Sequence, residues 1–153
     1  MLAIAFLFVR LEAAEFESLR EALVATLGTS QALKKTVQVE GQTVEVYLPK
    51  AGGPRRAVVQ KGVYPPNCTH TWVVGSTDSK TISEIRVVEM SCPHAFPCRS
   101  PGFLKQYLGK GLSSLPKLDR QVQSVAKATG SSELTTQAVR RTILALDLLG
   151  SQS

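Results

Sequence analysis

The sequence is poor in cysteine, in aromatic residues and in long apolar runs. Its 3 cysteines exclude a dense disulfide framework but allow one bridge. Aromatic residues make up 6% of the chain, too few for a platform that stacks single-stranded nucleic acid, so we expect no nucleic-acid partner. The apolar stretch 1–9 is too short to cross a bilayer, which takes about 20 residues. No internal repeat is visible, which argues against a repeat architecture.

The composition is that of one globular domain. A chain of 153 residues can bury a real core without metal or disulfide support. With 43% hydrophobic and 20% charged residues, it does not have the composition of a disordered protein. Lys and Arg number 18 against 12 for Asp and Glu, a formal charge of +6. That excess suits a phosphate ligand, an anionic partner or an anionic membrane surface, although the simplest interpretation is a solvated basic surface.

The N-terminal stretch resembles the apolar part of a secretory signal. It ends at Arg10, but no basic residue precedes it and no clear small-x-small cleavage site follows. We therefore interpret residues 1–14 as an export-signal remnant, a lipid-surface anchor or the first turns of a core helix. Residues 15–150 are expected to form a single domain.

Hydrophobic periodicity predicts the first half of that domain. Apolar residues spaced by three and four predict a helix over Glu15–Leu27, which Gly28 is suited to end. Two alternating runs follow, with a tight turn predicted at Gly41-Gln42 between them. The valines expected on the buried face of this hairpin are Val37, Val39, Val44 and Val46.

The remaining elements complete an α+β pattern. Further strands are predicted over Ala57–Tyr64, His70–Gly75 and Thr81–Met90, a short helix over Phe103–Leu108, a polar connection to Asp119, a short strand over Val122–Val125, and a final helix from about Ser132 to Leu149. This order implies an antiparallel sheet packed by helices.

The loop before the final helix is the most informative stretch for chemistry. Thr129, Gly130, Ser131 and Ser132 lead directly into the helix, and Lys127 adds a positive charge. The first turn of a helix has free N–H groups and a partial positive charge, so it is a natural place for a phosphate. The alternative is an ordinary helix cap, because serine is a standard N-cap residue.

This loop resembles the end of FMN-binding-family domains, which carry Asp-x-x-Ser/Thr-Gly-Ala-Thr-x-Ser-Ser before a helix with an Ala-Val pair. The chain has Gln-Ser-Val-Ala-Lys-Ala-Thr-Gly-Ser-Ser over residues 123–132. The residues that match in register are Ala128, Thr129, Ser131, Ser132, Ala138 and Val139. Departures fall at Gln123, Ala126 and Lys127, where the family has Asp, Ser/Thr and Gly. The family's glycine serves a backbone conformation that lysine tolerates poorly.

Upstream residues extend the resemblance to about Thr71–Leu149, roughly half of the chain. Soluble members carry a Glu-Pro-Arg-Gly-like loop, then a Phe-Leu-x-Gln-Phe helix and Gly-Lys. Residues 92–95 stand for that loop, with Cys92 in place of the acidic residue. Residues 103–107 and 109–110 stand for the helix and for Gly-Lys.

The resemblance implies a flavin carrier like those of sodium-translocating NADH:quinone reductase and related electron-transport complexes. Its threonine, matching Thr129, carries FMN through a phosphoester bond that a separate flavin transferase installs. The implied function is an electron-transfer carrier or subunit of an oxidoreductase complex, without independent catalysis or catalytic residues of its own. The implied partners are a membrane redox complex or a cytochrome, in an extracytoplasmic (periplasmic), membrane-associated location.

The residues expected to contact FMN fall into two groups. Those near the phosphate are Lys127, Ala128, Thr129, Gly130, Ser131 and Ser132. Pro93, Phe103 and Tyr107 are candidates to flank the isoalloxazine ring, or simply loop and core residues.

The cysteines and histidines allow other hypotheses. They form two clusters, Cys68-x-His70 and Cys92-x-His94-x-x-x-Cys98. A hairpin of the strands near 70–76 and 81–90 would bring both clusters to one end of the sheet. We predict that Cys92 and Cys98 lie close enough to form a disulfide, because Pro93 and Pro97 let the intervening loop fold back. A zinc or copper site is the alternative, and the cysteines also fit having no special role.

Two other function classes stay open at this stage. One is a structural or interaction subunit that keeps the fold without flavin, as the departures at Gln123 and Lys127 suggest. The other is a metal-binding module that uses the Cys/His clusters. FMN bound without a covalent link is a further possibility.

Overall fold

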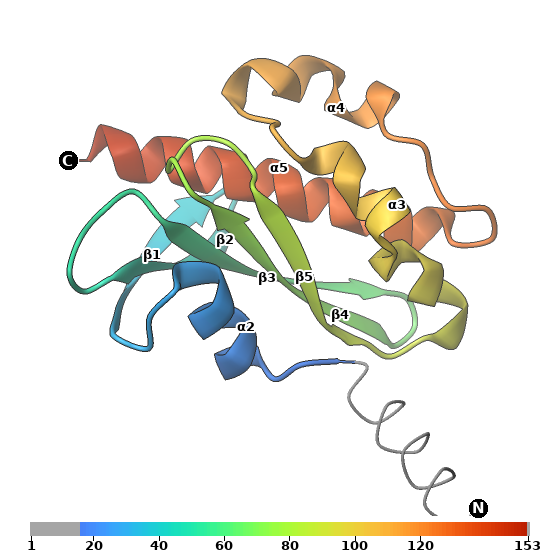
Figure 1. Cartoon of the computed structure of the whole chain (residues 1–153). Helices are drawn as coiled ribbons and strands as arrows, with labels where there is room; N and C mark the ends of the chain where they lie inside the picture. The colour runs from blue at the N-terminus through green and yellow to red at the C-terminus, as the bar shows by residue number, and fades with distance from the viewer. Residues whose placement is uncertain (1–15, 153) are drawn as a thin grey trace, which may run out of the picture.

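The structure, a computed structural model, describes residues 16–152 (Figure 1). The segment 1–14, interpreted above as an export-signal remnant or anchor, lies outside the described residues. Within residues 16–152, no helix is long and apolar enough to cross a membrane.

Five strands form one antiparallel sheet in chain order, which confirms the predicted α+β class. The strands are β1 (Ala32–Val39), β2 (Gln42–Pro49), β3 (Arg56–Tyr64), β4 (Cys68–Ser76) and β5 (Glu84–Met90). The helical elements are α2 (Leu19–Leu27), η1 (Pro93–Arg99), α3 (Pro101–Leu104), η2 (Lys105–Tyr107), η3 (Leu112–Ser114), α4 (Leu115–Gln121) and α5 (Thr129–Ser151).

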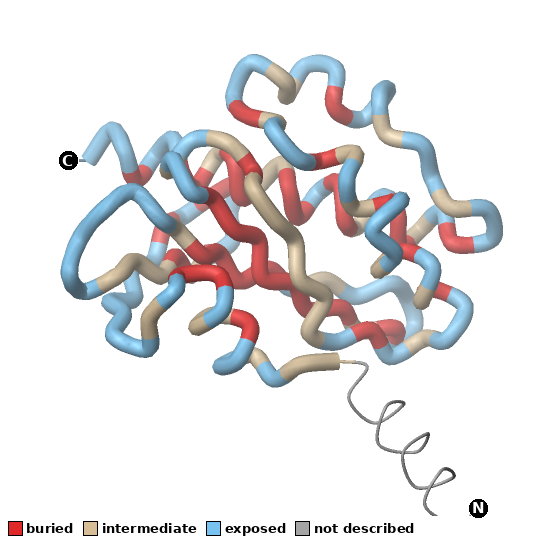
Figure 2. The backbone as a smooth tube through the Cα atoms, viewed as in Figure 1, coloured by how far each residue is buried: buried red, intermediate tan, exposed pale blue. Residues whose placement is uncertain are grey.

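Helices cover both faces of the sheet. Trp72 and Val74 of β4 pack in one core cluster with Val139 of α5, whereas Val73 packs with Ala22 of α2. Successive strand residues point to opposite faces, so a strand covered on both sides is buried along its length. The central strands are accordingly the most continuously buried part of the molecule (Figure 2). The long helix α5 thus sits on the sheet as its principal cover.

The first hairpin forms as expected, with its turn shifted by one residue. Val39 pairs with Gln42, so the two turn residues are Glu40 and Gly41. Both have positive φ angles, 50° and 78°. Such a pair matches the twist of the flanking strands and favours Asn-Gly. The four valines predicted to face the core are all buried.

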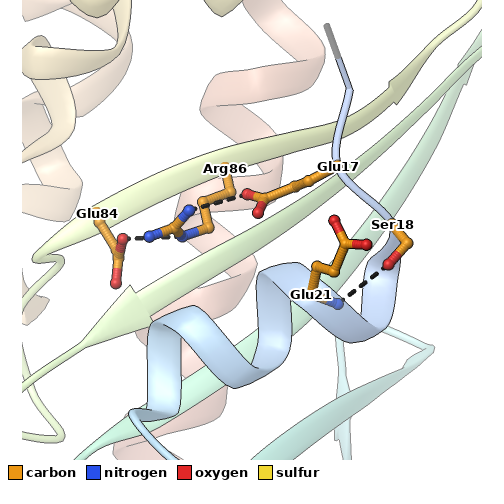
Figure 3. Close-up of polar contacts among 5 residues, drawn as sticks. All are labelled: Glu17, Ser18, Glu21, Glu84 and Arg86. Atoms are coloured by element: carbon orange, nitrogen blue, oxygen red, sulfur yellow. Dashed lines mark hydrogen bonds and ion pairs between the residues drawn. The ribbon is translucent and has the colours of Figure 1, made fainter. Parts of the chain in front are cut away.

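Helix α2 starts later than predicted and is tied to the sheet by charged side chains. The Ser18 side chain accepts a hydrogen bond from Glu21 N, and Gly28 ends the helix with a φ of 75°. Arg86 of β5 bonds to Glu17 at 2.9 Å and to Glu84 at 3.0 Å (Figure 3). The serine cap therefore sets the helix start at Leu19 instead of Glu15.

Three predictions about the segment before α5 were wrong or incomplete. Val122–Val125 is not a strand. The Gln106 side chain forms the hydrogen bonds with the backbone of this segment that a neighbouring strand would otherwise form. Its Oε1 accepts from Gln123 N at 2.7 Å, and its Nε2 donates to Gln123 O at 3.1 Å. The connection predicted to be only polar contains α4, and the helix predicted over Phe103–Leu108 is split into α3 and η2.

The turn at Glu40 gives a test of the hairpin. Glu40→Asn should raise the free energy of unfolding by about 0.5–1 kcal/mol, because Asn tolerates a left-handed backbone better than Glu. Chemical denaturation would measure the change. Glu40→Gln is the matched control, since it removes the exposed ion pair with Arg140 but leaves the backbone cost. An equal gain in both variants would contradict this explanation.

Candidate functional site

The site is built around the first turn of α5. Thr129 is the first residue of this 23-residue helix and is exposed. The N-cap is Ala128, and within the described chain no side chain caps the helix. The first N–H groups of a helix lack intrahelical acceptors, so an uncapped start is suited to an anion. Thr129 therefore presents a hydroxyl at the positive end of a long helix.

Ser131 and Ser132 lie inside the helix, because α5 begins three residues before the predicted Ser132. Both are buried, and their hydroxyls bond within the protein. The Ser132 hydroxyl accepts from Val125 N and donates to Ala128 O, each at 2.9 Å. These hydroxyls hold the loop to the helix in this structure and do not face an incoming phosphate.

Lys127 has a φ of 67°, in the left-handed region that favours glycine. It stands where the FMN-binding motif has its glycine, and the structure bears out the backbone conformation expected there. The following residue, Ala128, is 3% exposed. The loop thus has the geometry that the motif's Gly-Ala pair would serve.

Position 130 requires glycine, because the ring of Tyr64 lies against it. A Cβ on Gly130 would overlap the ring of Tyr64, the last residue of β3. Tyr64 is nevertheless 45% exposed. A half-exposed aromatic residue therefore lies against the helix turn that carries Thr129. The sequence pattern did not single out Tyr64, because nothing in it relates residue 64 to residue 130.

His70 connects the sheet to the same helix turn. It is 1% exposed, its Nδ1 lies 3.1 Å from Cys68 O and its Nε2 lies 3.0 Å from Ser131 Oγ. Since a carbonyl oxygen only accepts, Nδ1 carries the proton and Nε2 accepts from the serine. The ring also stacks on Trp72. Burial lowers the pKa of His70, which keeps the imidazole neutral.

The predicted Cys92–Cys98 disulfide was wrong: Cys68 bonds to Cys92, with their Cα atoms 5.5 Å apart. His70 pairs with Met90 in the β4–β5 ladder, and continuing that register sets residue 68 opposite residue 92. Strand pairing thus selects the partner. Cys98 remains a buried thiol, 3.6 Å from Ser132 Oγ, and its pKa is raised by burial.

The structure gives no support to the metal hypothesis. The disulfide takes up two of the five proposed ligand residues, and His70 is bonded to Cys68 O and Ser131. His94 is exposed on η1. Across residues 16–152, no three His, Cys, Asp or Glu side chains gather closely enough to hold a metal ion.

The three residues suggested to flank a flavin ring differ in how exposed they are to solvent. Pro93 is exposed at the start of η1, whereas Phe103 and Tyr107 are 5% and 0% exposed and belong to the core. The Tyr107 hydroxyl lies 2.8 Å from Thr136 Oγ1, and burial raises the pKa of Tyr107 to about 12. Phe103 and Tyr107 thus act as packing residues, the simpler of the two interpretations above.

A polar groove of about 630 Å³ runs along the outer side of α5. Its lining residues are Glu40, Gln42, Asp119, Val122, Ser124, Glu133, Thr136, Gln137, Arg140 and Arg141. Only Val122 among them is apolar, whereas ligand pockets are mostly apolar.

The strained loop yields a stability prediction. Lys127→Gly should raise the free energy of unfolding by about 0.5–1 kcal/mol relative to Lys127→Ala. Both variants remove a positive charge near a helix start, but only glycine relieves the left-handed backbone. Urea denaturation of the two variants measures the difference. Equal stabilities would show that the backbone at residue 127 costs nothing.

His70 yields a pH prediction. Its folded-state pKa is lowered, so the unfolded chain takes up a proton that the folded chain does not as the pH falls. Acidification from about pH 7 to about pH 5 should therefore reduce stability, and His70→Gln should flatten that slope.

A more acidic range provides the control. Hydrogen bonds, led by that from Thr81 N, lower the pKa of Asp78 well below its usual range. The stability that this carboxylate contributes is lost only below about pH 4, in wild type and His70→Gln alike. Identical slopes of the two proteins from about pH 7 to about pH 5 would contradict the neutral-histidine assignment.

Comparison with known proteins identified no relative of this chain. No protein-family model, curated protein or solved structure matches this chain. A functional proposal therefore rests on the motif before α5 and on the contacts around Thr129.

Proposed function

We propose that the protein is a flavin-carrying electron-transfer domain, with FMN attached through its phosphate to Thr129 Oγ. The observation that carries the proposal is the exposed Thr129 hydroxyl at the uncapped start of α5, in the position of the motif's acceptor threonine. Bound flavin would supply one- or two-electron chemistry, and the protein would hold and tune it.

The phosphate end of the flavin fits the residues present. A phosphoester on Thr129 keeps negative charge beside the N–H groups of the first helical turn, where the helix dipole favours an anion. Lys127 lies two residues away and is exposed, so its ammonium adds positive charge without being buried. Ser131 and Ser132 contribute indirectly, because their internal hydrogen bonds hold the loop and the turn together.

The conformation of the loop gives further support. The left-handed backbone at Lys127, the buried Ala128 and the contact between Gly130 and Tyr64 each favour a small residue or glycine. Two of these positions hold such residues: Ala128 matches the motif, and Gly130 leaves room for the Tyr64 ring. The third, Lys127, is accommodated at a net backbone cost of about 0.5–1 kcal/mol relative to glycine.

The cellular setting is part of the same proposal. A Cys68–Cys92 disulfide is expected to persist in an oxidising compartment, which favours an extracytoplasmic location. There the domain would exchange electrons with a membrane redox complex or a cytochrome. A separate flavin transferase would be needed, because attachment joins the FMN phosphate to the threonine oxygen with loss of the elements of water.

Mass spectrometry after co-expression with a flavin transferase and export tests the proposal. Wild type should gain the mass of one FMN less one water, and Thr129→Ala should gain nothing. Ser124→Ala, which removes another exposed hydroxyl of the same loop, is the matched control and should still be labelled. Thr129→Ala should change stability by no more than about 0.5 kcal/mol, since it is an exposed substitution.

Restoring the motif tests whether a failure of labelling comes from poor recognition by the transferase or from a likeness of fold alone. If wild type is not labelled, the double substitution Gln123→Asp and Lys127→Gly should recover labelling, because it returns the acidic residue and the glycine. A folded double variant that also remains unlabelled and colourless would overturn the proposal. The chain would then be a structural or interaction subunit that keeps the fold without flavin.

A further inference from the structure

The Cys68–Cys92 disulfide lies on the same side of the sheet as α5. Cys68 and His70 are two residues apart on β4, so their side chains point to the same face. The His70 ring reaches Ser131 of α5 at 3.0 Å. The turn between β3 and β4, the start of η1 and the start of α5 meet at one end of the molecule (Figure 1).

A second contact brings this disulfide to the first turn of α5. Tyr64 is the register partner of Cys68 across the β3–β4 pair, and the Tyr64 ring contacts Gly130. Thr129 is the residue before Gly130 and shares its helical turn. Two independent contacts, through His70 and through Tyr64, therefore hold the disulfide beside the turn that carries Thr129.

The surroundings of the disulfide suit reversible chemistry. Cys68 is 3% exposed, but Cys92 is only partly buried and can exchange protons with solvent. A helix N-terminus favours a thiolate, the species that forms when such a bond opens, and α5 starts at this same end of the molecule (Figure 1). Cys98 differs, because it is buried and its hydrogen-bond partners Ala128 and Ser132 belong to the protein interior.

We propose that Cys68 and Cys92 form a redox-active pair that exchanges two electrons with the flavin on Thr129. This inference rests on the proposed function. The S–S bond would break, and each sulfur would take one electron and one proton to become a thiol; fully reduced FMN would supply the two electrons and two protons and would become oxidised FMN. The reverse reaction restores the disulfide. Tyr64, half-exposed and in contact with Gly130, is the aromatic residue of this region that an attached flavin could reach.

Thiol counting in the full-length protein tests the exchange directly. Flavin-loaded wild type is photoreduced without oxygen, then unfolded in denaturant, alkylated and weighed. Three adducts should appear, mapped by peptide analysis to Cys68, Cys92 and Cys98, whereas the unreduced protein should carry one, on the free thiol Cys98. Thr129→Ala with an equal concentration of free FMN should gain few adducts beyond that one in the same time, because its flavin is not held at the helix start.

A redox titration gives a second readout. The loaded wild type should take up four electrons per chain, two for the flavin and two for the disulfide, whereas the loaded double substitution Cys68→Ser and Cys92→Ser should take up two. A flavin spectrum and circular dichroism confirm that the double variant is loaded and folded. If it does not fold, thiol counting on the wild type still decides.

The possible failures can be told apart. If the wild type carries no flavin on Thr129, the proposed function fails and the exchange fails with it. If the flavin is attached and reduced but Cys68 and Cys92 remain bonded, only the exchange is overturned, and the disulfide is structural.

Discussion

The seating of α5 on the sheet determines where Thr129 stands. Apolar contacts such as those among Trp72, Val139 and Ile143 provide the attraction, but they are not directional. Direction comes from buried hydrogen bonds that join the helix to other elements. These are Ser131 to His70, Thr136 to Tyr107 and Thr142 to Gln60. A shift of the helix would leave buried polar groups unpaired, at about 1–3 kcal/mol for each group.

The same hydrogen bonds explain how the chain tolerates a strained residue before α5. Ser132 accepts from Val125 N and donates to Ala128 O, so it holds the backbone on both sides of Lys127. A left-handed lysine persists when its surroundings over-determine the conformation. Strain of this kind commonly occurs beside functional residues, and here it lies two positions from the proposed flavin attachment point.

Much of the architecture could be predicted from residue patterns. Alternating valines predicted the β1–β2 hairpin, apolar spacing predicted α2 and α5, and Gly28 ended α2 as expected. The errors share a cause. The Gln106 side chain satisfied a backbone segment that resembled a strand, and β4–β5 pairing chose Cys68 instead of Cys98 for Cys92. Both outcomes depend on partners distant in sequence, which local patterns do not contain.

The sequence by itself determined the α+β class, the long final helix and the position where glycine would be preferred, although Thr129 begins that helix instead of preceding it. These follow from local periodicity and from the motif, which act over a few residues. Only the tertiary structure decided that Ser131 and Ser132 turn inward, that Tyr64 lies on Gly130 and that Cys92 bonds to Cys68. Those facts arise from strand register and helix packing, which bring together residues from 24 to more than 60 positions apart in the chain.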